Sequence, residues 1–282
     1  FNGWIHQLFV EPDFHFKYFG FHWVENPGET GIYLLFAIKA ISALAIALGL
    51  FYRGAVLAFI ISFAWIELID ASNYLNHHYL VILFALLLLF APANKAASLD
   101  VYFGRTSKVT RIPAWSLHVI MLQISIVYFF AGWAKLSTDW LMHGMPLRIW
   151  LPQYADWSLV GGLFDLPITA LVFSWVGAIY DLSIWAFLWF KKTRSIAYLF
   201  VVLFHGMTGL LFNIGIFPWV MILSNLIFFS AEKHEKVWSF FTAFIPGENL
   251  RMQASKAWVA AILVLYLGIQ LILPMRHVFY PG

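Results

Sequence analysis

The stretch WSLHVIMLQISIVYFFAGWAKLSTDW, residues 115–140, contains a long and largely apolar run that ends at a single lysine, Lys135. A helix rises 1.5 Å per residue, so about 20 apolar residues are needed to cross the hydrocarbon core of a bilayer. The stretch therefore predicts a membrane-spanning helix with one ammonium group close to its end. No acidic residue in this stretch lies nearer to Lys135 than Asp139.

The whole chain repeats this pattern. Of its 282 residues, 62% are hydrophobic and only 11% are charged, which is outside the range of soluble domains. Eight segments approach the length of a span, at residues 32–50, 54–71, 75–91, 116–135, 166–190, 195–212, 216–230 and 257–273. The sequence therefore predicts an all-α fold, a polytopic transmembrane helical bundle with about eight spans.

The domain organisation follows from where these segments begin. Residues 1–31 include FHFKYFGFHWV (14–24), which mixes aromatic and polar residues without forming a span. We expect 1–31 to be an aromatic-rich interfacial segment and 32–282 to be one transmembrane helical domain. Because the chain starts at Phe1 and stops at FYPG, we also expect it to be an internal piece of a longer protein.

Composition excludes several functions. The chain has no cysteine, which excludes disulfides, thiol catalysis and thiolate metal sites. Its basic residues lie in short loops and form no stripe, so we expect the lipid bilayer and not nucleic acid as a partner. Twelve of them fall in alternate loops, which the positive-inside rule makes cytoplasmic: Arg53; Lys95, Arg105, Lys108 and Arg111; Lys191, Lys192 and Arg194; Lys233, Lys236, Arg251 and Lys256.

This orientation gathers the unexplained polar residues on the opposite, non-cytoplasmic side. They occur in NYLNHHYL (73–80), in the sequence around Lys135, and in FNIGIF (212–217). A lysine costs about 2.5–3.5 kcal/mol at the bilayer centre but little near a helix end, where it can reach water. Lys135 is therefore either an interfacial lysine beside Trp133 and Trp140, or a partly desolvated amine that acts as a general base.

The histidines leave similar alternatives. His77 is either a water-facing imidazole or a hydrogen-bond donor aimed at charge that develops in a reaction. His205 and Asp181 lie well inside their segments, where each either satisfies a neighbouring helix or belongs to a site. Adjacent His77 and His78 point about 100° apart on a helix, so we expect no metal site. The many aromatic residues suit a pocket for a flat apolar ligand such as a quinone.

Several motifs in order resemble the vitamin K-dependent gamma-carboxylase family, in particular the HTTM membrane domain of its bacterial members. They are LNHHYL (75–80), IVYFFAGWAKLSTDW (126–140), LFHGMTGLLFNIGIFPWVM (203–221) and QLILPMRHVFYPG (270–282), together with DASNYLNHHYL, APANKAASLD and GLFYRG. The resemblance covers nearly the whole chain.

The resemblance implies a mechanism. In the family an intramembrane lysine deprotonates vitamin K hydroquinone, O2 adds, and the strong base that results removes a γ proton from a glutamate side chain. CO2 then traps the carbanion, which gives γ-carboxyglutamate and vitamin K epoxide. Lys135 stands at the position of that lysine, and His77 at the histidine that steadies the reacting oxygen species. Asn76 lies beside His77, and we expect Asn76 and His205 to bind the cofactor.

The chain also departs from the family pattern. Animal members have a second lysine where this chain has Ala134, and a disulfide that a cysteine-free chain cannot form. We expect that the family's C-terminal soluble domain, which helps to bind the protein substrate, and one upstream helix are absent from this chain. We therefore expect the hydroquinone site to be intact and the carboxylation of a protein substrate to be weak or lost.

Two rival hypotheses stay open. In the first, the chain oxidises a quinol such as a bacterial menaquinol to the epoxide or quinone without carboxylation. In the second, it is a non-enzymatic membrane assembly module or a transporter, although we find no inverted repeat of the kind that transporters have. We expect a multi-pass protein of a bacterial plasma membrane, a quinone-type small molecule and a glutamate-containing protein as partners, and the site on the non-cytoplasmic side.

Overall fold

The computed structural model describes residues 3–109, 111–230, 232–234, 251–253 and 257–275. Lys236, Lys256 and residues 276–282 of the last motif lie outside these ranges. The chain divides into two compact units. In the described ranges, unit 1 comprises residues 3–116 and 251–253, and unit 2 comprises residues 117–230, 232–234 and 257–275.

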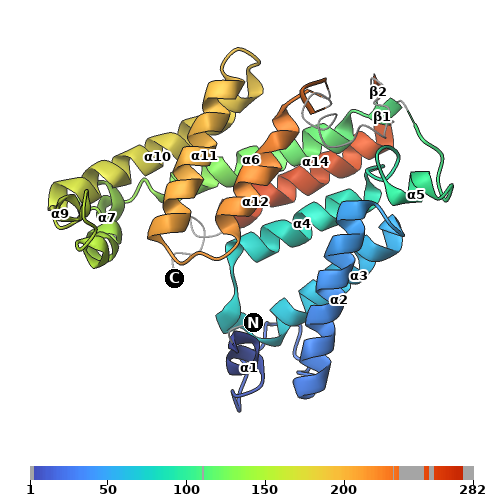
Figure 1. Ribbon diagram of the computed structural model, residues 1–282, viewed down its shortest axis with the longest axis horizontal. Coiled ribbons are helices and arrows are strands. Elements are labelled where there is room, and N and C mark those ends of the chain that lie inside the picture. Colours follow the sequence, from blue (N-terminus) through green and yellow to red (C-terminus); the bar gives the residue numbers. More distant parts are fainter. Residues whose placement is uncertain (1–2, 110, 231, 235–250, 254–256, 276–282) are drawn as a thin grey trace. The chain divides into compact units, whose positions relative to one another are not determined.

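Unit 1 is built around three apolar helices. Helices α2 and α3 lie side by side in Figure 1, and α4 packs against α3. In order along the chain, its elements are α1 (Trp4–Phe9), α2 (Gly28–Leu48), α3 (Tyr52–Ile69), the 3-10 helix η1 (Ala71–Asn73), α4 (Asn76–Phe90), α5 (Leu99–Tyr102), β1 (Arg111–Pro113) and β2 (Arg251–Gln253). Strands β1 and β2 pair in parallel, with Arg111 opposite Arg251.

Unit 2 contains four long apolar helices and the short elements between them. Helix α10 starts with Pro167 in its first turn, where proline's missing N–H leaves no helical bond unmade. The elements are α6 (Trp115–Ala134), which begins two residues before the unit, α7 (Thr138–Leu141), α8 (Leu147–Trp150), η2 (Leu151–Tyr154), α9 (Gly161–Phe164), α10 (Pro167–Trp189), α11 (Arg194–Leu211), α12 (Phe217–Ser224), η3 (Asn225–Phe228), α14 (Ala257–Ile272) and η4 (Leu273–Met275).

The prediction of a mostly helical membrane protein is confirmed, whereas the count of about eight spans is not. Each of the eight predicted segments contains a helix. In the described part of the chain, six helices are long and apolar enough to cross a membrane: α2, α3, α6, α10, α11, and α14 with η4. The segments at Asn76–Phe90 and Phe217–Phe228 are shorter apolar helices, so the count of about eight stays a prediction.

The turn between α2 and α3 is held by a segment fifty residues farther along the chain. Gly49 ends α2 with φ +62°, and a Cβ added to it would lie 2.4 Å from the Cβ of Ser98. The Asp100 carboxylate accepts hydrogen bonds from the backbone N–H groups of Phe51 and Tyr52 at 2.9 and 3.1 Å. These bonds satisfy amides at the start of α3 that have no partner within the helix.

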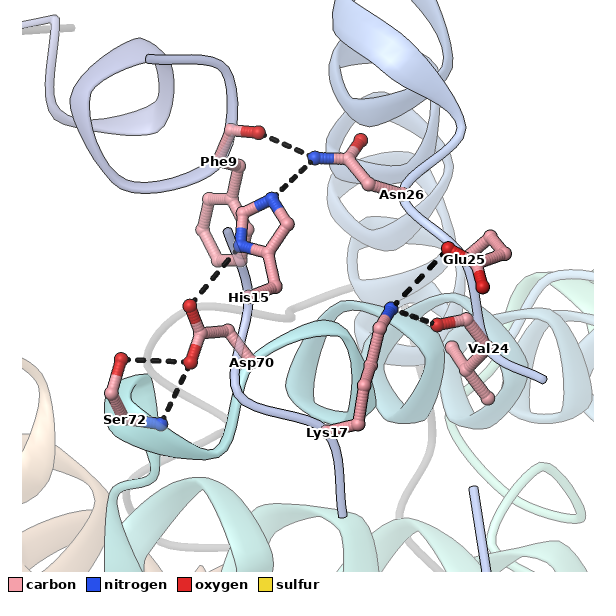
Figure 2. Close-up of polar contacts among 8 residues, drawn as sticks. All are labelled: Phe9, His15, Lys17, Val24, Glu25, Asn26, Asp70 and Ser72. Carbon is pink, nitrogen blue, oxygen red and sulfur yellow. Dashed lines mark hydrogen bonds and ion pairs between the residues drawn. The ribbon is translucent and has the colours of Figure 1, made fainter. Parts of the chain in front are cut away.

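The aromatic-rich N-terminal segment is tied to the end of α3 by the polar network in Figure 2. His15 Nδ1 lies 3.1 Å from Asp70 Oδ2, and Asp70 Oδ1 accepts from the backbone N–H of Ser72 at 2.9 Å. Asn26 donates to His15 Nε2 at 2.9 Å, which leaves Nδ1 as the histidine's donor to Asp70. Several aromatic side chains of the segment stay exposed, among them Phe19 at 97%. The assignment of 1–31 as interfacial remains a prediction.

Candidate functional site

Lys135 follows directly after the last residue of α6, and its ammonium group faces α10. Lys135 Nζ lies 2.7 Å from Asp181 Oδ2 and donates to the backbone oxygen of Ala131 at 3.1 Å. It also lies 5.2 Å from the centre of the Trp140 ring. The Lys135 side chain is 20% exposed and that of Asp181 is 6% exposed. The structure therefore contains a nearly buried ion pair where the sequence showed one isolated cation.

A cavity of about 450 Å³ opens beside this pair, and every residue that lines it belongs to unit 2. Lys135 and Asp181 line it together with apolar side chains such as Val176, Phe173 and Leu211. Ligand pockets for small molecules commonly measure about 300–1,000 Å³ and are mostly apolar with a few polar groups. The cavity thus has the size and the lining of a site for an apolar molecule with one or two polar atoms.

The close approach of α6 and α10 positions the pair. A Cβ added to Gly132 would lie 2.8 Å from the backbone nitrogen of Leu182. Only glycine lets the two backbones come so near, and Leu182 is the neighbour of Asp181 in the chain. The glycine in AGWAKL therefore sets how far Asp181 lies from Lys135.

A second polar cluster lies in the same cavity wall. The hydroxyl of Tyr128 on α6 lies 3.0 Å from His205 Nε2 on α11, and Asn225 Nδ2 donates to this hydroxyl at 3.0 Å. The hydroxyl accepts from Asn225 and also lies 3.5 Å from the hydroxyl of Tyr180. In the arrangement in which its own proton goes to His205 Nε2, the ring proton lies on Nδ1. Tyr128 and His205 both line the cavity.

Two atoms of this cluster have no hydrogen-bond partner among the described residues. They are His205 Nδ1 and Asn225 Oδ1, both of them buried. Buried polar atoms are usually satisfied, so the unpartnered Nδ1 of the cavity-lining His205 is a group that a bound molecule could satisfy. The role of His205 in binding a cofactor stays a prediction.

A comparison with protein families now bears on this geometry. The model of the HTTM domain matches residues 1–232. The chain belongs to the HTTM domain family, the domain of the vitamin K-dependent gamma-carboxylase family. The family assignment and the six apolar helices together identify an integral membrane protein. No solved structure matches the chain.

In this HTTM domain, the predicted site residues fall in both units. Lys135 and His205 lie in unit 2 and line one cavity, while His77 and Asn76 lie in unit 1 at the start of α4. Phe212, Ile214 and Phe217 of the predicted FNIGIF segment line the same cavity as Lys135. The two motifs therefore meet at one cavity, and the membrane side on which they lie stays a prediction.

The surroundings of His77 differ from those of its neighbours. His77 is 9% exposed, whereas Asn76, the first residue of α4, is exposed. The ring centre of His77 lies 4.7 Å from that of His78, which pairs with Glu67 at 2.9 Å. The water-facing reading of His77 is thus disfavoured, and the roles of His77 and Asn76 stay predictions. Within the described ranges, no three His, Asp or Glu residues are grouped as a metal site requires.

Sequence reasoning missed two members of the site, Tyr128 and Asn225. Both look like ordinary residues of apolar helices, and only the contact of α6 with α11 and η3 joins them to His205. Asp181 was noticed, but its partner was not. An intramembrane acid and an intramembrane base in one chain were the signal that could have paired it with Lys135.

Proposed function

We propose that this HTTM protein is a vitamin K-dependent gamma-glutamyl carboxylase-like enzyme that oxidises vitamin K hydroquinone to the epoxide. In the proposal, Lys135 is the base that takes the proton of the hydroquinone hydroxyl. The observation that carries it is the placement of the Lys135–Asp181 pair in the wall of a large apolar cavity. Family membership supports the choice of substrate.

Pairing with Asp181 allows Lys135 to act as a base while the two residues together carry no net charge. A buried pair of opposite charges is poorly solvated, which reduces the advantage of the ionic form over the form in which the proton lies on Asp181 and the Lys135 amine is neutral. The neutral amine then accepts the hydroxyl proton at Nζ, and the ammonium that forms lies between protonated Asp181 and the deprotonated hydroxyl oxygen, whose negative charge balances it. Asp181 is thus proposed as a positioning and proton-holding residue.

The polar cluster at Tyr128 and His205 supports binding of the second oxygen of the hydroquinone, away from Lys135. A hydroquinone has two oxygens on opposite sides of a flat ring, and the cavity has polar groups at Lys135 and at Tyr128–His205. We propose that His205 binds the cofactor through its unpartnered Nδ1. The apolar walls supply the binding energy of the ring and keep water from the reacting atoms.

Family membership supports the remaining steps of the proposed reaction. Reduced vitamin K and O2 supply the strong base that removes the glutamate γ proton, and CO2 is the group that is added. His77 is proposed as the residue that steadies the reacting oxygen species and Asn76 as its companion, on the motif NHHYL. We further propose that the site faces the non-cytoplasmic side of a bacterial plasma membrane, as the loop charges predict.

The test is an epoxidation assay of the purified protein in nanodiscs with reduced vitamin K and O2. Two variants separate the base from the ion pair: Lys135→Ala removes both, whereas Lys135→Arg keeps a cation beside Asp181 that cannot be deprotonated. We expect both variants to lose epoxide formation by about 10²–10⁴-fold. Full activity of Lys135→Arg would refute the proposed base.

The same assay distinguishes the rival hypotheses. Incorporation of labelled CO2 into an added glutamate peptide supports the carboxylase, and epoxide or quinone without incorporation supports the quinol oxidation that lacks carboxylation. If a folded protein forms neither product and Lys135 is replaceable, the non-enzymatic assembly or transport function is favoured.

A further inference from the structure

Two family-like motifs have no part in the proposed function, yet they form one cavity in unit 1. They are GLFYRG (49–54) at the turn from α2 to α3 and APANKAASLD (91–100) after α4. The cavity measures about 500 Å³ and is lined by residues 51–54, Asn94, Lys95, Asp100, Arg105 and Thr106. It differs from the site in unit 2 because most of the residues that line it are polar or charged.

The single carboxylate in this cavity is already occupied. Asp100 accepts from the backbone N–H groups of Phe51 and Tyr52 and from Asn94 Nδ2, the last at 2.9 Å. Burial raises the pKa of Asp100, but these three hydrogen bonds and the charge of Arg105 outweigh it and lower the pKa overall. Asp100 is therefore ionised at neutral pH, and its acceptor capacity serves the turn.

Three cationic side chains surround the cavity, and in the described part of the chain none of them forms a salt bridge with a carboxylate. The guanidinium carbon of Arg105 lies 3.8 Å from the centre of the Phe51 ring, and Arg53 donates to the backbone oxygen of Phe90 at 3.4 Å. Lys95 Nζ donates to the hydroxyl of Thr106. Three cations against one saturated carboxylate leave an excess of positive charge, which attracts an anion.

The position of the cavity indicates which anion. It lies where α2 ends and α3 begins, and both helices are long and apolar enough to cross a membrane. The ends of such helices lie at the level of the lipid headgroups. Guanidinium groups match the geometry of phosphate oxygens, and Arg53 and Arg105 are both exposed enough to reach one.

We propose that the cavity formed by GLFYRG and APANKAASLD binds a phosphate group, with Arg53, Lys95 and Arg105 as its cationic ligands. The two sources of such a group are an anionic phospholipid and free phosphate. Binding of a lipid here anchors the turn between α2 and α3 at the membrane face. This site is independent of the proposed enzyme activity.

The test is a titration of the delipidated protein in detergent, followed by native mass spectrometry. The ligands are phosphatidylglycerol, phosphatidylcholine and inorganic phosphate. The variant Arg53→Gln with Arg105→Gln removes two cations, and Lys191→Gln with Lys192→Gln is the matched control in the turn between α10 and α11. Each cation near a membrane surface contributes about fivefold to the binding of an anionic lipid, so we expect a loss of about 30-fold in the cavity variant only.

The arms of the titration separate the outcomes. Phosphatidylglycerol binding that depends on the two arginines assigns the site to a lipid, and binding of inorganic phosphate with the same dependence assigns it to the free ion. Unchanged affinity in the cavity variant, or an equal loss in the lysine control, overturns the proposal. If the double variant melts below the wild type, the single variant Arg105→Gln is used. The Arg105 guanidinium lies over the Phe51 ring and, among the described residues, its side chain donates no hydrogen bond to the backbone.

Discussion

Lys135 Nζ and Asp181 Oδ2 lie 2.7 Å apart although 46 residues separate them in the chain. The pair joins the end of α6 to the middle of α10 in a wall of the apolar cavity of unit 2. An ion pair in such surroundings is stable only while both partners are present, because a lone charge left in an apolar site is costly. This relationship determines how variants of the site are to be interpreted.

The first prediction concerns the stability of the pair. We expect Asp181→Leu alone to lower the free energy of unfolding by about 3–5 kcal/mol, because it strands the ammonium of Lys135. The double variant Lys135→Met with Asp181→Leu should recover most of this loss, since an apolar pair of similar volume has no charge to desolvate. Thermal unfolding in detergent measures both. Equal losses in the single and the double variant would contradict the buried-pair interpretation.

The second prediction concerns the approach of α6 and α10. Gly132→Ala should destabilise the protein by about 1–3 kcal/mol, because the new methyl group overlaps the backbone of Leu182 and pushes α10 away. Gly206→Ala is the matched control on α11, where a Cβ meets nothing within 4 Å. There we expect no loss, and a gain of up to about 1 kcal/mol from helix propensity. A comparison of the two melting temperatures tests the prediction.

The third prediction concerns the hydroxyl of Tyr128. Tyr128→Phe removes the partner of His205 Nε2 and one of the two partners of Asn225 Nδ2, which also donates to the backbone oxygen of Met221. Leaving a buried polar group unsatisfied costs about 1–3 kcal/mol. Tyr198→Phe, which removes one hydroxyl bond to the backbone oxygen of Ile222 at 3.3 Å, is the control and should cost less. If the proposed function holds, Tyr128→Phe also weakens binding of reduced vitamin K. An unchanged KM with an unchanged melting temperature would remove Tyr128 from the site.

The fourth prediction concerns acid and the network at Asp70. Burial raises the pKa of Asp70, but hydrogen bonds from the N–H and hydroxyl of Ser72 and from His15 lower it by more. The pKa of Asp70 therefore lies below its ordinary value. A group with a lowered pKa in the folded state contributes stability that is fully present above its unfolded pKa, about 3.9. The contribution is lost as the pH falls through the lower, folded value.

Hydrogen–deuterium exchange of peptides that cover residues 12–18 and 68–74 tests this prediction. Protection should hold from pH 7 to about pH 4 and fall below it, because protonated Asp70 releases Ser72 and His15. In Asp70→Asn we expect weaker protection at pH 7 and no further fall below pH 4. Protection in the wild type that persists well below pH 3 would show that other contacts hold the segment.

Local patterns explain how much of the fold the sequence predicts. Apolar runs of span length gave the membrane class and the approximate position of each helix, since the bilayer requires satisfied backbone groups over a known thickness. The first segment begins at Gly28 and not at residue 32. Its first four residues, Gly-Glu-Thr-Gly, are polar or small, so the apolar pattern does not include them. The segments at Asn76–Phe90 and Phe217–Phe228 proved shorter than a full span.

The sequence by itself determined that this protein is a helical membrane protein, that it resembles the family to which it belongs, and that Lys135, His77, Asn76 and His205 are its candidate site residues. Only the tertiary structure decided that Lys135 is paired with Asp181, that the Tyr128 hydroxyl contacts His205, and that Asn225 donates to this hydroxyl. The physical reason is that hydropathy reports the environment of each residue along one helix. Which polar groups meet depends on how separate helices pack, and Gly132 shows that this packing is set by side-chain shape.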